Sequence, residues 1–549
     1  MRQQALEFVS IDLNERQLFD LELILNRGFY PLTGFMGKED YLSVIHHMSL
    51  ADGSGSVWPI PVCLDVSESF ARSLQPDQLI GLNDQEGFLL AIMKVSDVWK
   101  PDKHEEALLV YGSDDTNAHP GVRQLLDQNG PWYIGGSVEG VSLPVHYDFL
   151  QLRLTPSECV RRFTMNGWRK VIGFHTEHYL HCAHREMVLD AAGKVGASIF
   201  LQPVVGLDHP GDVDFFTHIT CYQVFTQKFP ANMIMLGLSP FASRKAGPRE
   251  ALLQAIMRKN FGCSHFIVSE DQADPFARSN GQTKLFYERG AAQQLVREYA
   301  EKTSIEMVPQ QDYCYDKTTN TYFPLGDSGK QQKKITSAEL QRKMMKGEEI
   351  PPWFAWPDMV NELQRAFPPK SKQGFTIFLT GLSGSGKSTI AKVLLVKFME
   401  MRDRPVTLLD GDIVRKNLSS ELTFSREHRD LNVIRIGFVA SEITKNGGIA
   451  ICAPIAPYEE PRQANRALIS HYGGYIEVHV ATPLEVCEQR DRKGLYAKAR
   501  SGKIKGVTGI TDPYIQPNNP DIVIDTSSIT PLEAVQEILL NLQSQGYLL

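Results

Sequence analysis

A glycine-rich run that ends in a lysine and two hydroxyl residues carries the clearest chemical pattern in this sequence. Residues 381–389 read Gly-Leu-Ser-Gly-Ser-Gly-Lys-Ser-Thr, which is the spacing of a phosphate-binding P-loop. The apolar stretch 374–380 precedes the run and the helix-compatible stretch 390–401 follows it, so the loop joins a strand to a helix. Glycines let backbone N–H groups turn toward phosphate oxygens, and a helix N-terminus adds positive potential. The pattern therefore predicts a site for ATP rather than a chance turn.

Each polar group of this loop has an expected role. Lys387 is expected to reach the β- and γ-phosphates, and the Ser388 hydroxyl to ligate Mg²⁺. The remaining predicted nucleotide contacts in the loop are Gly381, Ser383, Gly384, Ser385, Gly386 and Thr389. A P-loop predicts ATP and Mg²⁺ as ligands, but it does not identify the acceptor of the phosphate.

The segments after the loop narrow the acceptor. They include Asp410-Gly-Asp412 with Arg415, Phe424-Ser425, Arg429 with Asn432 and Arg435, the run 490–496, the run 504–510 and Asp512-Pro-Tyr514. In this order and spacing, residues 371–549 resemble the adenylyl-sulfate kinases, with their DGDxxR, FS and RxxNIxR elements. A lone arginine would be read as a surface ion pair, and a different P-loop kinase would leave these matches unexplained.

The resemblance implies specific roles in transfer of the ATP γ-phosphate to the 3′-hydroxyl of adenylyl sulfate. Asp412 would lie near that hydroxyl as a base or as an orienter of Mg²⁺. The substrate-binding set would be Arg415, Phe424, Arg429, Asn432, Lys493 and Thr508, with Phe424 stacked on the base. Arg490, a further nucleotide contact, and Lys493 would belong to a mobile lid.

Two segments depart from the kinase pattern, at three positions. The family's Ser-Pro-Tyr-Arg reads Ala456-Pro-Tyr-Glu459, and the Phe of its FTG reads Val507. We expect Glu459 to weaken the hold on an anionic substrate unless Arg462 compensates. Slower or weaker kinase activity is predicted, not its loss.

The N-terminal two thirds of the chain resemble ATP sulfurylase, which makes adenylyl sulfate from ATP and sulfate. The matching segments are 31–37, His119-Pro-Gly121, 203–206, 211–213, 246–251 (which contains Arg249) and Pro352-Trp-Phe354. The resemblance spans nearly all of residues 1–355 and implies a common fold. Fusion of a sulfurylase to a kinase is a known arrangement in this family.

The sulfurylase signature itself is degenerate. The family's Gln-x-Arg-Asn-Pro-x-His-x-x-His aligns with residues 175–184, where only His181 and His184 are kept. Glu177 replaces the sulfate-binding Arg and His178 replaces the Asn, while His175 stands at the Gln position. The family's Gly-Arg-Asp-His reads 269–272 with Glu270 at the Arg, and further departures are His209 and His218.

These exchanges replace positive charge by negative charge at the point where the reaction brings two anions together. Sulfate attacks beside the α-phosphate of ATP, so the site must supply cations and hydrogen-bond donors. A carboxylate at ~4 Å from an oxyanion costs on the order of 4 kcal/mol at an effective dielectric near 20. We therefore predict that this half no longer makes adenylyl sulfate.

Four histidines recur at every third position from His175 to His184. On a helix such spacing places imidazoles on one face, where they could hold a metal. Inheritance of His181 and His184 from the nucleotide motif, with the other two on the preceding loop, is the favoured interpretation because no distant Cys or His cluster completes a site.

These sites require several domains, because 549 residues exceed one hydrophobic core. Residues 1–150 show short apolar segments broken by Pro and Gly, which favours a β-rich domain; the resemblance implies a PUA-like one. Residues 151–325 and 371–549 alternate strand-like and helical stretches, which predicts two α/β units with parallel sheets. The Lys- and Pro-rich residues 326–370 are predicted to bridge and link them. The expected fold is a multidomain α/β protein with a nucleotidyltransferase-like sulfurylase domain and a P-loop kinase.

Bulk composition limits the partners and the compartment. The net charge of −7 argues against a nucleic-acid surface, which is normally basic. No apolar run reaches the roughly 18 residues of a membrane span, and residues 1–25 lack a signal-peptide core. The eight cysteines form no CxxC pair, which favours reduced thiols in a cytoplasmic protein. The resemblance also implies a homo-oligomer, either a dimer or a larger assembly.

Three functions compete at this stage. The favoured one is an adenylyl-sulfate kinase carrying a degenerate sulfurylase domain with a structural, oligomerising or ligand-sensing role. The second is a fully bifunctional enzyme, and the third is a regulatory protein whose halves only bind nucleotides. The intact Lys387, Ser388 and Asp412 count against the third.

Overall fold

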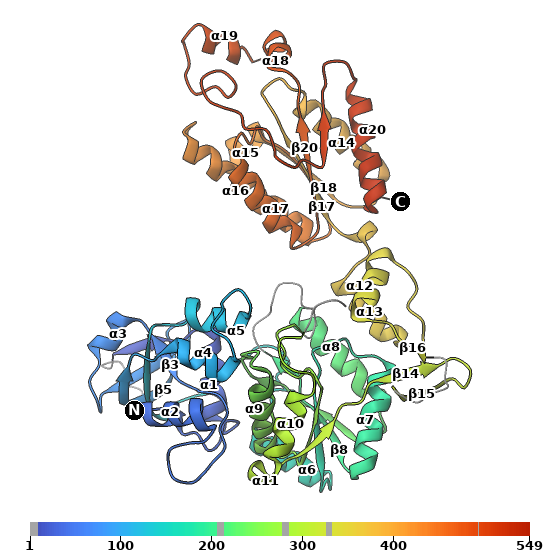
Figure 1. Cartoon of the computed structure of the whole chain (residues 1–549). Helices are drawn as coiled ribbons and strands as arrows, with labels where there is room; N and C mark the ends of the chain where they lie inside the picture. Colours follow the sequence, from blue (N-terminus) through green and yellow to red (C-terminus); the bar gives the residue numbers. More distant parts are fainter. Residues whose placement is uncertain (1–8, 206–213, 277–284, 326–331, 492, 549) are drawn as a thin grey trace. The chain divides into compact units, whose positions relative to one another are not determined.

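The computed structural model describes residues 9–205, 214–276, 285–325, 332–491 and 493–548 of the chain, which forms two compact units. The first unit comprises residues 1–341 and 350–366, and the second comprises residues 342–349 and 367–549 (Figure 1). The two units are described separately below. No helix among the described residues is long and apolar enough to cross a membrane.

The first unit begins with a six-stranded, mostly antiparallel sheet. Its strands are β1 (Ser10–Asp12), β2 (Gly34–Phe35), β3 (Leu64–Val66), β4 (Leu79–Asn83), β5 (Leu89–Trp99) and β6 (Trp132–Gly140), and their order is β1-β4-β5-β6-β2 with β3 paired to β6. The helices of this part are α1 (Glu15–Leu25), α2 (Lys38–His47), α3 (Glu68–Ser73), α4 (Lys103–Tyr111) and α5 (Pro120–Arg123). The predicted β-rich N-terminal part is confirmed.

A five-stranded parallel sheet forms the second part of this unit. Its strands are β7 (Val171–Phe174), β8 (Ser198–Leu201), β10 (Ile234–Leu236), β12 (His265–Val268) and β13 (Glu306–Pro309), in the order β10-β8-β7-β12-β13. The accompanying helices are α6 (Pro156–Met165), α7 (Cys182–Val195), α8 (Phe215–Thr226), α9 (Gly247–Asn260), α10 (Ala291–Glu298) and α11 (Ala300–Thr303). Two further short strands, β9 (Val204–Val205) and β11 (Ser239–Pro240), pair with each other. The predicted alternation of strands and helices is confirmed.

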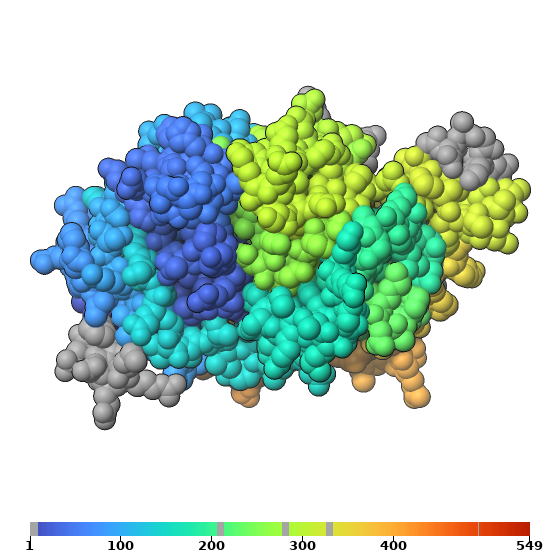
Figure 2. All heavy atoms as spheres, turned by 90° about the horizontal axis from the view of Figure 1, so that it is seen from below, coloured from blue at the N-terminus to red at the C-terminus, as the bar shows by residue number. Residues whose placement is uncertain are grey.

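The two parts of the first unit share one hydrophobic core. Side chains from the β-rich part, such as Trp58 and Val95, belong to the same buried cluster as Phe200 and Leu252 of the α/β part. Asn260 adds donors to the carbonyls of Gly28 and Tyr30, at 2.9 and 2.8 Å. Figure 2 shows this contact from outside, with the dark blue N-terminal segment packed against green segments. The two parts therefore stabilise each other.

The first unit ends in a small antiparallel sheet and two helices. The strands are β14 (Tyr313–Asp316), β15 (Thr321–Pro324) and β16 (Gln332–Lys333), and the helices are α12 (Ser337–Lys346), which runs on into residues of the second unit, and α13 (Pro357–Ala366). The division of the chain at residues 150, 325 and 370 remains a prediction.

The second unit is a parallel sheet covered by helices on both faces (Figure 1). Its strands are β17 (Phe375–Thr380), β18 (Val406–Asp410), β19 (Ile449–Ala453), β20 (Gly474–Val480) and β21 (Ile522–Ile524), in the order β18-β19-β17-β20-β21. Its helices are α14 (Lys387–Met401), α15 (Gly411–Asn417), α16 (Arg426–Lys445), α17 (Glu459–Ser470), α18 (Leu484–Arg490), α19 (Leu495–Arg500) and α20 (Pro531–Gln545). The five predicted strands are all present.

Strand β17 shows why this sheet needs two helical layers. All six of its residues are buried. Phe375, Ile377 and Leu379 join the core formed with α14 and α20, while Phe378 joins the core formed with α16 and α17. Successive side chains of a strand point to opposite faces, so a continuous apolar run demands cover on both sides. The P-loop therefore leaves the sheet at its buried centre.

Candidate active sites

The P-loop connects β17 to α14 and folds as a cradle. Gly384 and Gly386 have φ values of 76° and 106°, in the left-handed region that favours glycine. A Cβ atom at Gly384 would also approach the carbonyl oxygen of Cys487 to 3.0 Å. Both positions therefore require glycine, as the spacing predicts.

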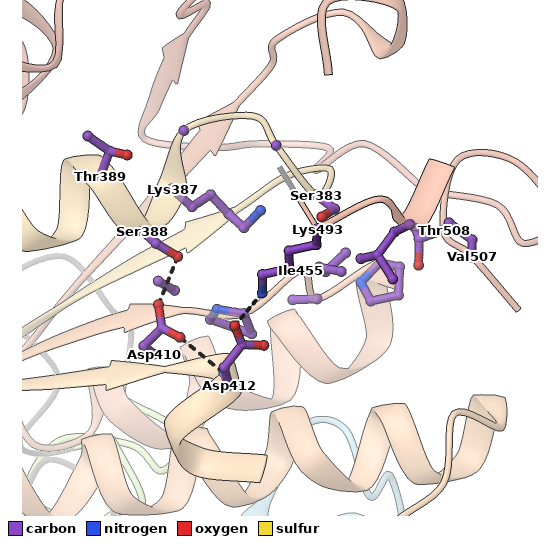
Figure 3. Close-up of a pocket in the computed structure, with 18 of the residues that line it drawn as sticks. Ser383, Lys387, Ser388, Thr389, Asp410, Asp412, Ile455, Lys493, Val507 and Thr508 are labelled. Atoms are coloured by element: carbon purple, nitrogen blue, oxygen red, sulfur yellow. Dashed lines mark hydrogen bonds and ion pairs between the residues drawn. The ribbon is translucent and has the colours of Figure 1, made fainter. Parts of the chain in front are cut away.

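Lys387 is held at the mouth of this cradle (Figure 3). Its Nζ donates to the carbonyl oxygens of Gly381 and Leu382, at 2.8 and 2.7 Å. The side chain is buried, and this burial lowers the pKa of Lys387 to about 8. An ammonium held among carbonyls at a helix N-terminus is suited to bind phosphate oxygens.

Two carboxylates face the loop from the end of β18 (Figure 3). The Ser388 hydroxyl donates to Asp410 Oδ2 at 2.8 Å, and Asp410 Oδ1 accepts the backbone N–H of Asp412 at 3.0 Å. Asp412 forms an ion pair with Lys493. A hydroxyl beside two carboxylates is the hard-oxygen donor set that Mg²⁺ prefers, so Ser388, Asp410 and Asp412 fit the predicted cation.

A cavity of about 700 Å³ opens between these groups and the acceptor side. Its lining includes most of the predicted residues: Ser383, Gly384, Gly386, Lys387, Ser388, Thr389, Asp412, Arg415, Phe424, Arg429, Asn432, Arg490, Lys493 and Thr508. Among the described lining residues five are basic and three are acidic, so the cavity suits an anion. Gly381 and Ser385 are not among the described residues that line the cavity. The Thr389 side chain points away from the carboxylates (Figure 3).

The acceptor side of the cavity is built mainly by α16. Arg429 is buried, donates to Thr508 Oγ1 at 3.2 Å and pairs with Asp512 at 2.8 Å. Asn432 is also buried, and its Oδ1 has no hydrogen-bond partner among the described residues. Both residues belong to the lining of the cavity.

An aromatic ring and an arginine complete this side. Phe424 is 66% exposed, and the Arg415 guanidinium lies 4.4 Å from its ring centroid. Arg415 also donates to the carbonyls of Leu422 and Thr423, at 3.2 and 3.1 Å. An exposed ring at the edge of a cavity can stack on a base.

The predicted lid is attached to the P-loop. Arg490 donates to the hydroxyl and the carbonyl of Thr526, both at 2.8 Å, and Tyr496 donates to the carbonyl of Ser383 at 2.8 Å. Arg492, the remaining basic residue of this run, lies outside the described residues.

In the first unit, residues 175–181 lie on the loop after β7, and His184 lies in the first turn of α7. Lys245 pairs with both oxygens of Glu177, at 2.8 and 2.9 Å. His178 lies 3.8 Å from Asp271, and Glu270 pairs with Arg289 at 3.1 Å. Each introduced carboxylate is therefore neutralised by a cation of the protein itself.

His175 is a buried structural residue. Its Nδ1 accepts from Arg258 at 2.7 Å and its Nε2 lies 3.2 Å from the Gln272 amide. Burial, together with the Arg258 charge, lowers its pKa well below the usual value, so the imidazole stays neutral. Gln272 stands where the family has His, so the two exchanges contact each other.

The two retained histidines pack together. The rings of His181 and His184 lie 4.0 Å apart, and both Nδ1 atoms are buried without a hydrogen-bond partner among the described residues. Burial lowers the pKa of His184 to about 3. Across the described ranges, no group of three or more His, Cys, Asp or Glu side chains is arranged to hold a metal.

Arg249 contacts the β-rich part of the first unit. Its guanidinium donates to the carbonyls of Val44, Ile45 and Pro59 in the β-rich part, at 3.3, 3.0 and 3.1 Å. It ties α9 to that part, and these bonds do not involve the Glu177 cluster. The motif residues 206 and 211–213 and His209 lie outside the described residues.

Three family models match the chain: PUA-like domain over residues 1–143, ATP-sulfurylase over 150–366 and Adenylylsulphate kinase over 373–525. Sulfate adenylyltransferase of Mycosarcoma maydis is 46% identical over 554 residues, covering 100% of this chain and 96% of that protein. The chain belongs to this family. Sulfate adenylyltransferase of Coccidioides immitis (strain RS) is also 46% identical, covering 98% of this chain and 93% of the relative. A solved structure described as "Hexameric APS kinase from Thiobacillus denitrificans" is 37% identical with a TM-score of 0.81, covering 100% of this chain and 96% of that one.

The predicted fold classes are thereby confirmed: a PUA-like domain, an ATP-sulfurylase domain and a P-loop adenylylsulphate kinase domain.

The kinase domain nevertheless departs from the family at Glu459, and the structure shows how. Glu459 forms an ion pair with Arg462, and Arg462 is completely buried, donating to the carbonyls of Ala456 and Ile515 at 2.6 and 3.0 Å. The suggestion that Arg462 replaces the lost substrate cation is therefore wrong, because its charge is used inside the domain.

Two residues of the candidate sites were given no role from the sequence. Asp410 contacts the proposed Mg²⁺ ligand Ser388. Its position in Asp-Gly-Asp at the end of β18 could have indicated this contact, because ligands bind at the carboxyl ends of parallel strands. Lys245, the partner of Glu177, had no signal, because the two are 68 residues apart.

Proposed function

We propose that the second unit transfers the γ-phosphate of ATP to the 3′-hydroxyl of adenylyl sulfate. The observation that carries this proposal is one cavity lined by the P-loop on one side and by Arg429 and Asn432 on the other. Two anionic substrates need such paired binding surfaces, because in-line transfer requires both to be oriented together.

Asp412 is the proposed base. The 3′-hydroxyl gives its proton to the Asp412 carboxylate while its oxygen forms a bond to the γ-phosphorus, and the bond from that phosphorus to the β–γ bridging oxygen breaks. Lys493, which now pairs with Asp412, must release it and is free to bind the negative charge of the substrates. Mg²⁺ held near Ser388 and Asp410 would neutralise charge on the β- and γ-phosphates.

We further propose that the ATP-sulfurylase domain does not make adenylyl sulfate. Glu177 occupies the position of the family's sulfate-binding Arg, and it forms an ion pair with Lys245 at 2.8 Å. Lys245 attracts an entering sulfate less strongly because it is already paired, and the Glu177 carboxylate repels the sulfate. The self-neutralised cluster supports this proposal.

The second candidate is a fully bifunctional enzyme. It is favoured by the relatives named sulfate adenylyltransferase, which match over the whole chain. Under this alternative Lys245 would release Glu177 and bind sulfate directly.

Paired assays on the full-length protein with Mg-ATP test both candidates. One assay supplies adenylyl sulfate and follows its 3′-phosphorylation, and the other supplies sulfate and follows pyrophosphate. We expect turnover in the first only, with Lys387→Ala as the control that removes it. Sulfate-dependent pyrophosphate release would overturn the inactive-sulfurylase proposal, and absence of 3′-phosphorylation would overturn the kinase proposal.

We also propose that the protein acts in the cytoplasm as a homo-oligomer. The support for assembly is the solved relative described as hexameric, which covers the whole chain. Sedimentation of the full-length protein tests it.

A further inference from the structure

Ala456, in the wall of the kinase cavity, has a backbone conformation that residues other than glycine rarely adopt. Its φ is 46°, in the left-handed region where a Cβ atom crowds the following carbonyl oxygen. The segment 454–457 lines the cavity, and its member Ile455 is labelled there in Figure 3. A strained residue persists only where its surroundings hold it, and such residues cluster at functional sites.

Two side chains contact the carbonyl group of Ala456. Arg462 of α17 donates to it from Nη1 at 2.6 Å, and Thr380 at the end of β17 lies within donating distance at 3.2 Å. The Thr380 hydroxyl is closer to the carbonyl oxygen of Ile455, at 2.7 Å, and a hydroxyl has one proton to donate. Arg462 is therefore the main partner of the strained carbonyl.

The same arginine holds a second segment. Its Nη2 donates to the carbonyl of Ile515 at 3.0 Å, and the Ile515 backbone N–H donates to the carbonyl of Pro457 at 2.8 Å. Asp512, three residues before Ile515, is the ion-pair partner of Arg429 at 2.8 Å. Arg462 thus connects the cavity wall to the segment that holds a proposed substrate-binding arginine.

Carboxylates fix the orientation of Arg462. The residue is completely buried, pairs with Glu459, and has its Nε 3.2 Å from Oε1 of the buried Glu477. Glu477 pairs in turn with Arg466 at 3.1 Å, and Arg466 pairs with Asp521 at 2.8 Å. Buried ion pairs often add no stability over apolar side chains of the same volume. The geometry that these charges impose is therefore the better explanation for their presence.

We propose that Arg462 is a positioning residue for the acceptor: it holds Ala456 in the left-handed conformation and so sets the wall against which adenylyl sulfate binds. The inference rests on the proposed kinase function and deepens it. Arg462 acts through the wall, since it is not among the described residues that line the cavity. Without its bonds, Ala456 is expected to relax to an unstrained conformation and to displace Ile455 and Pro457.

The variant Arg462→Lys tests this role, because one ammonium does not reproduce the planar fork of a guanidinium. We expect it to raise KM for adenylyl sulfate by at least about tenfold, and KM for ATP much less, because the displaced wall belongs to the acceptor side. An unchanged KM for adenylyl sulfate in a folded Arg462→Lys protein would overturn the proposal.

The decisive measurement is rescue by the double variant Ala456→Gly/Arg462→Lys. Glycine adopts the left-handed region without strain, so the wall no longer needs the arginine, and we expect most of the increase in KM to disappear. The matched control is Arg402→Gly/Arg462→Lys. Arg402, the C-cap of α14, also has a left-handed φ, of 53°, and is not among the described lining residues.

The control separates positioning from stability. Arg402→Gly relieves similar strain in the same unit, so it should raise the melting temperature of Arg462→Lys and leave its KM high. Equal recovery of KM in both double variants, or in neither, would overturn the proposal. If Arg462→Lys does not fold, Glu459→Gln takes its place in the same comparison. It loosens the arginine from a side chain that is 18% exposed.

Hydrogen–deuterium exchange of the full-length protein tests the contact without catalysis. The Ile515 amide donates to the carbonyl of Pro457, so its exchange should be several-fold faster in Arg462→Lys than in the wild type. Unchanged exchange would overturn the positioning role whether or not the kinase reaction occurs. Failure of the kinase proposal appears instead in the wild type, as absence of 3′-phosphorylation, so the two failures are distinguishable.

Discussion

At the scale of single residues, neighbouring charged groups have different roles because their partners differ. Asp410 is tied to Ser388 and to the backbone of Asp412, whereas Asp412 forms an ion pair with Lys493 of the predicted lid. The first carboxylate has a fixed geometry suited to orienting a cation. The second is held by an exposed pair that can open when substrates bind.

Replacing Lys493 by Met separates catalysis from stability. The side chains of Lys493 and Asp412 are 58% and 73% exposed, and exposed pairs add little to folding. We expect Lys493→Met to leave the melting temperature unchanged and to lower kcat/KM for adenylyl sulfate by at least about tenfold, because a cation near the transferred group is lost. Steady-state kinetics and thermal unfolding of the same sample check this. A variant that loses stability but keeps full kcat/KM would contradict it.

Glu106 in the PUA-like domain provides a pH-dependent prediction. Burial raises its pKa from 4.5 to about 7, although Tyr133 and Tyr41 donate to its Oε2 at 3.0 and 3.2 Å. A carboxyl group with a raised pKa stabilises the fold while it is protonated in the native state. That contribution is complete below pH 4.5 and is lost as the pH rises to about 7.

The variant Glu106→Gln should remove this dependence, because the amide oxygen still accepts from both tyrosines and does not ionise. Over that interval the wild type should lose up to about 3 kcal/mol relative to the variant, at about 1.4 kcal/mol per pKa unit. Calorimetry of both proteins across the pH range measures the difference. Parallel pH profiles would show that the pKa of Glu106 is not raised.

At the scale of elements, the kinase site depends on how closely α16 packs on α17. A Cβ atom at Gly437 would lie 1.9 Å from Asn465 Oδ1, and Asn465 Nδ2 donates to the carbonyl of Val433 at 2.9 Å. Gly437 lies in the middle of α16, where any larger residue would collide with the Asn465 side chain of α17. The close approach of the two helices therefore requires glycine at this position. The contact holds in place the helix that carries the proposed substrate-binding residues Arg429 and Asn432.

Replacing Gly437 by Ala should therefore displace Asn465 and destabilise the kinase unit by about 1–3 kcal/mol. A matched control is Gly193→Ala in α7, another helical glycine, where a Cβ atom meets nothing within 4 Å. That control should be neutral or slightly stabilising. Thermal unfolding compares the two, and equal melting temperatures would contradict the packing argument.

At the scale of the whole molecule, the chain combines two units with separate cores. The first has a sulfurylase site filled by its own ion pairs, and the second has an open anion cavity. The chain thus joins a large folded domain to the unit that is proposed to do the chemistry.

Ligand-dependent calorimetry should separate these units. We expect two unfolding transitions, of which saturating Mg-ATP with adenylyl sulfate raises the one that belongs to the kinase unit, by about 2.7 kcal/mol at a hundredfold excess over Kd. Lys387→Ala should abolish that shift while leaving the other transition in place. An equal rise in both transitions would show that the first unit also binds these ligands.

The sequence by itself determined the local chemistry and the fold classes. The P-loop, the DGD segment and the parallel-sheet strands are patterns of contiguous residues, and their hydrogen bonding and burial follow from short spacings. For the same reason a family pattern could place Arg429, Asn432 and Thr508 in one site, and the structure gathers them around one cavity.

Only the tertiary structure decided the pairing of charges. Glu177 with Lys245 and Arg249 with the carbonyls of Val44 and Ile45 join residues distant in the chain, and no local spacing encodes such contacts. Arg462 also looked available from sequence but is buried, because its charge is satisfied by Glu459 and by backbone oxygens. Whether a charge serves a ligand or the fold depends on which groups the folded chain brings within a few ångströms of it.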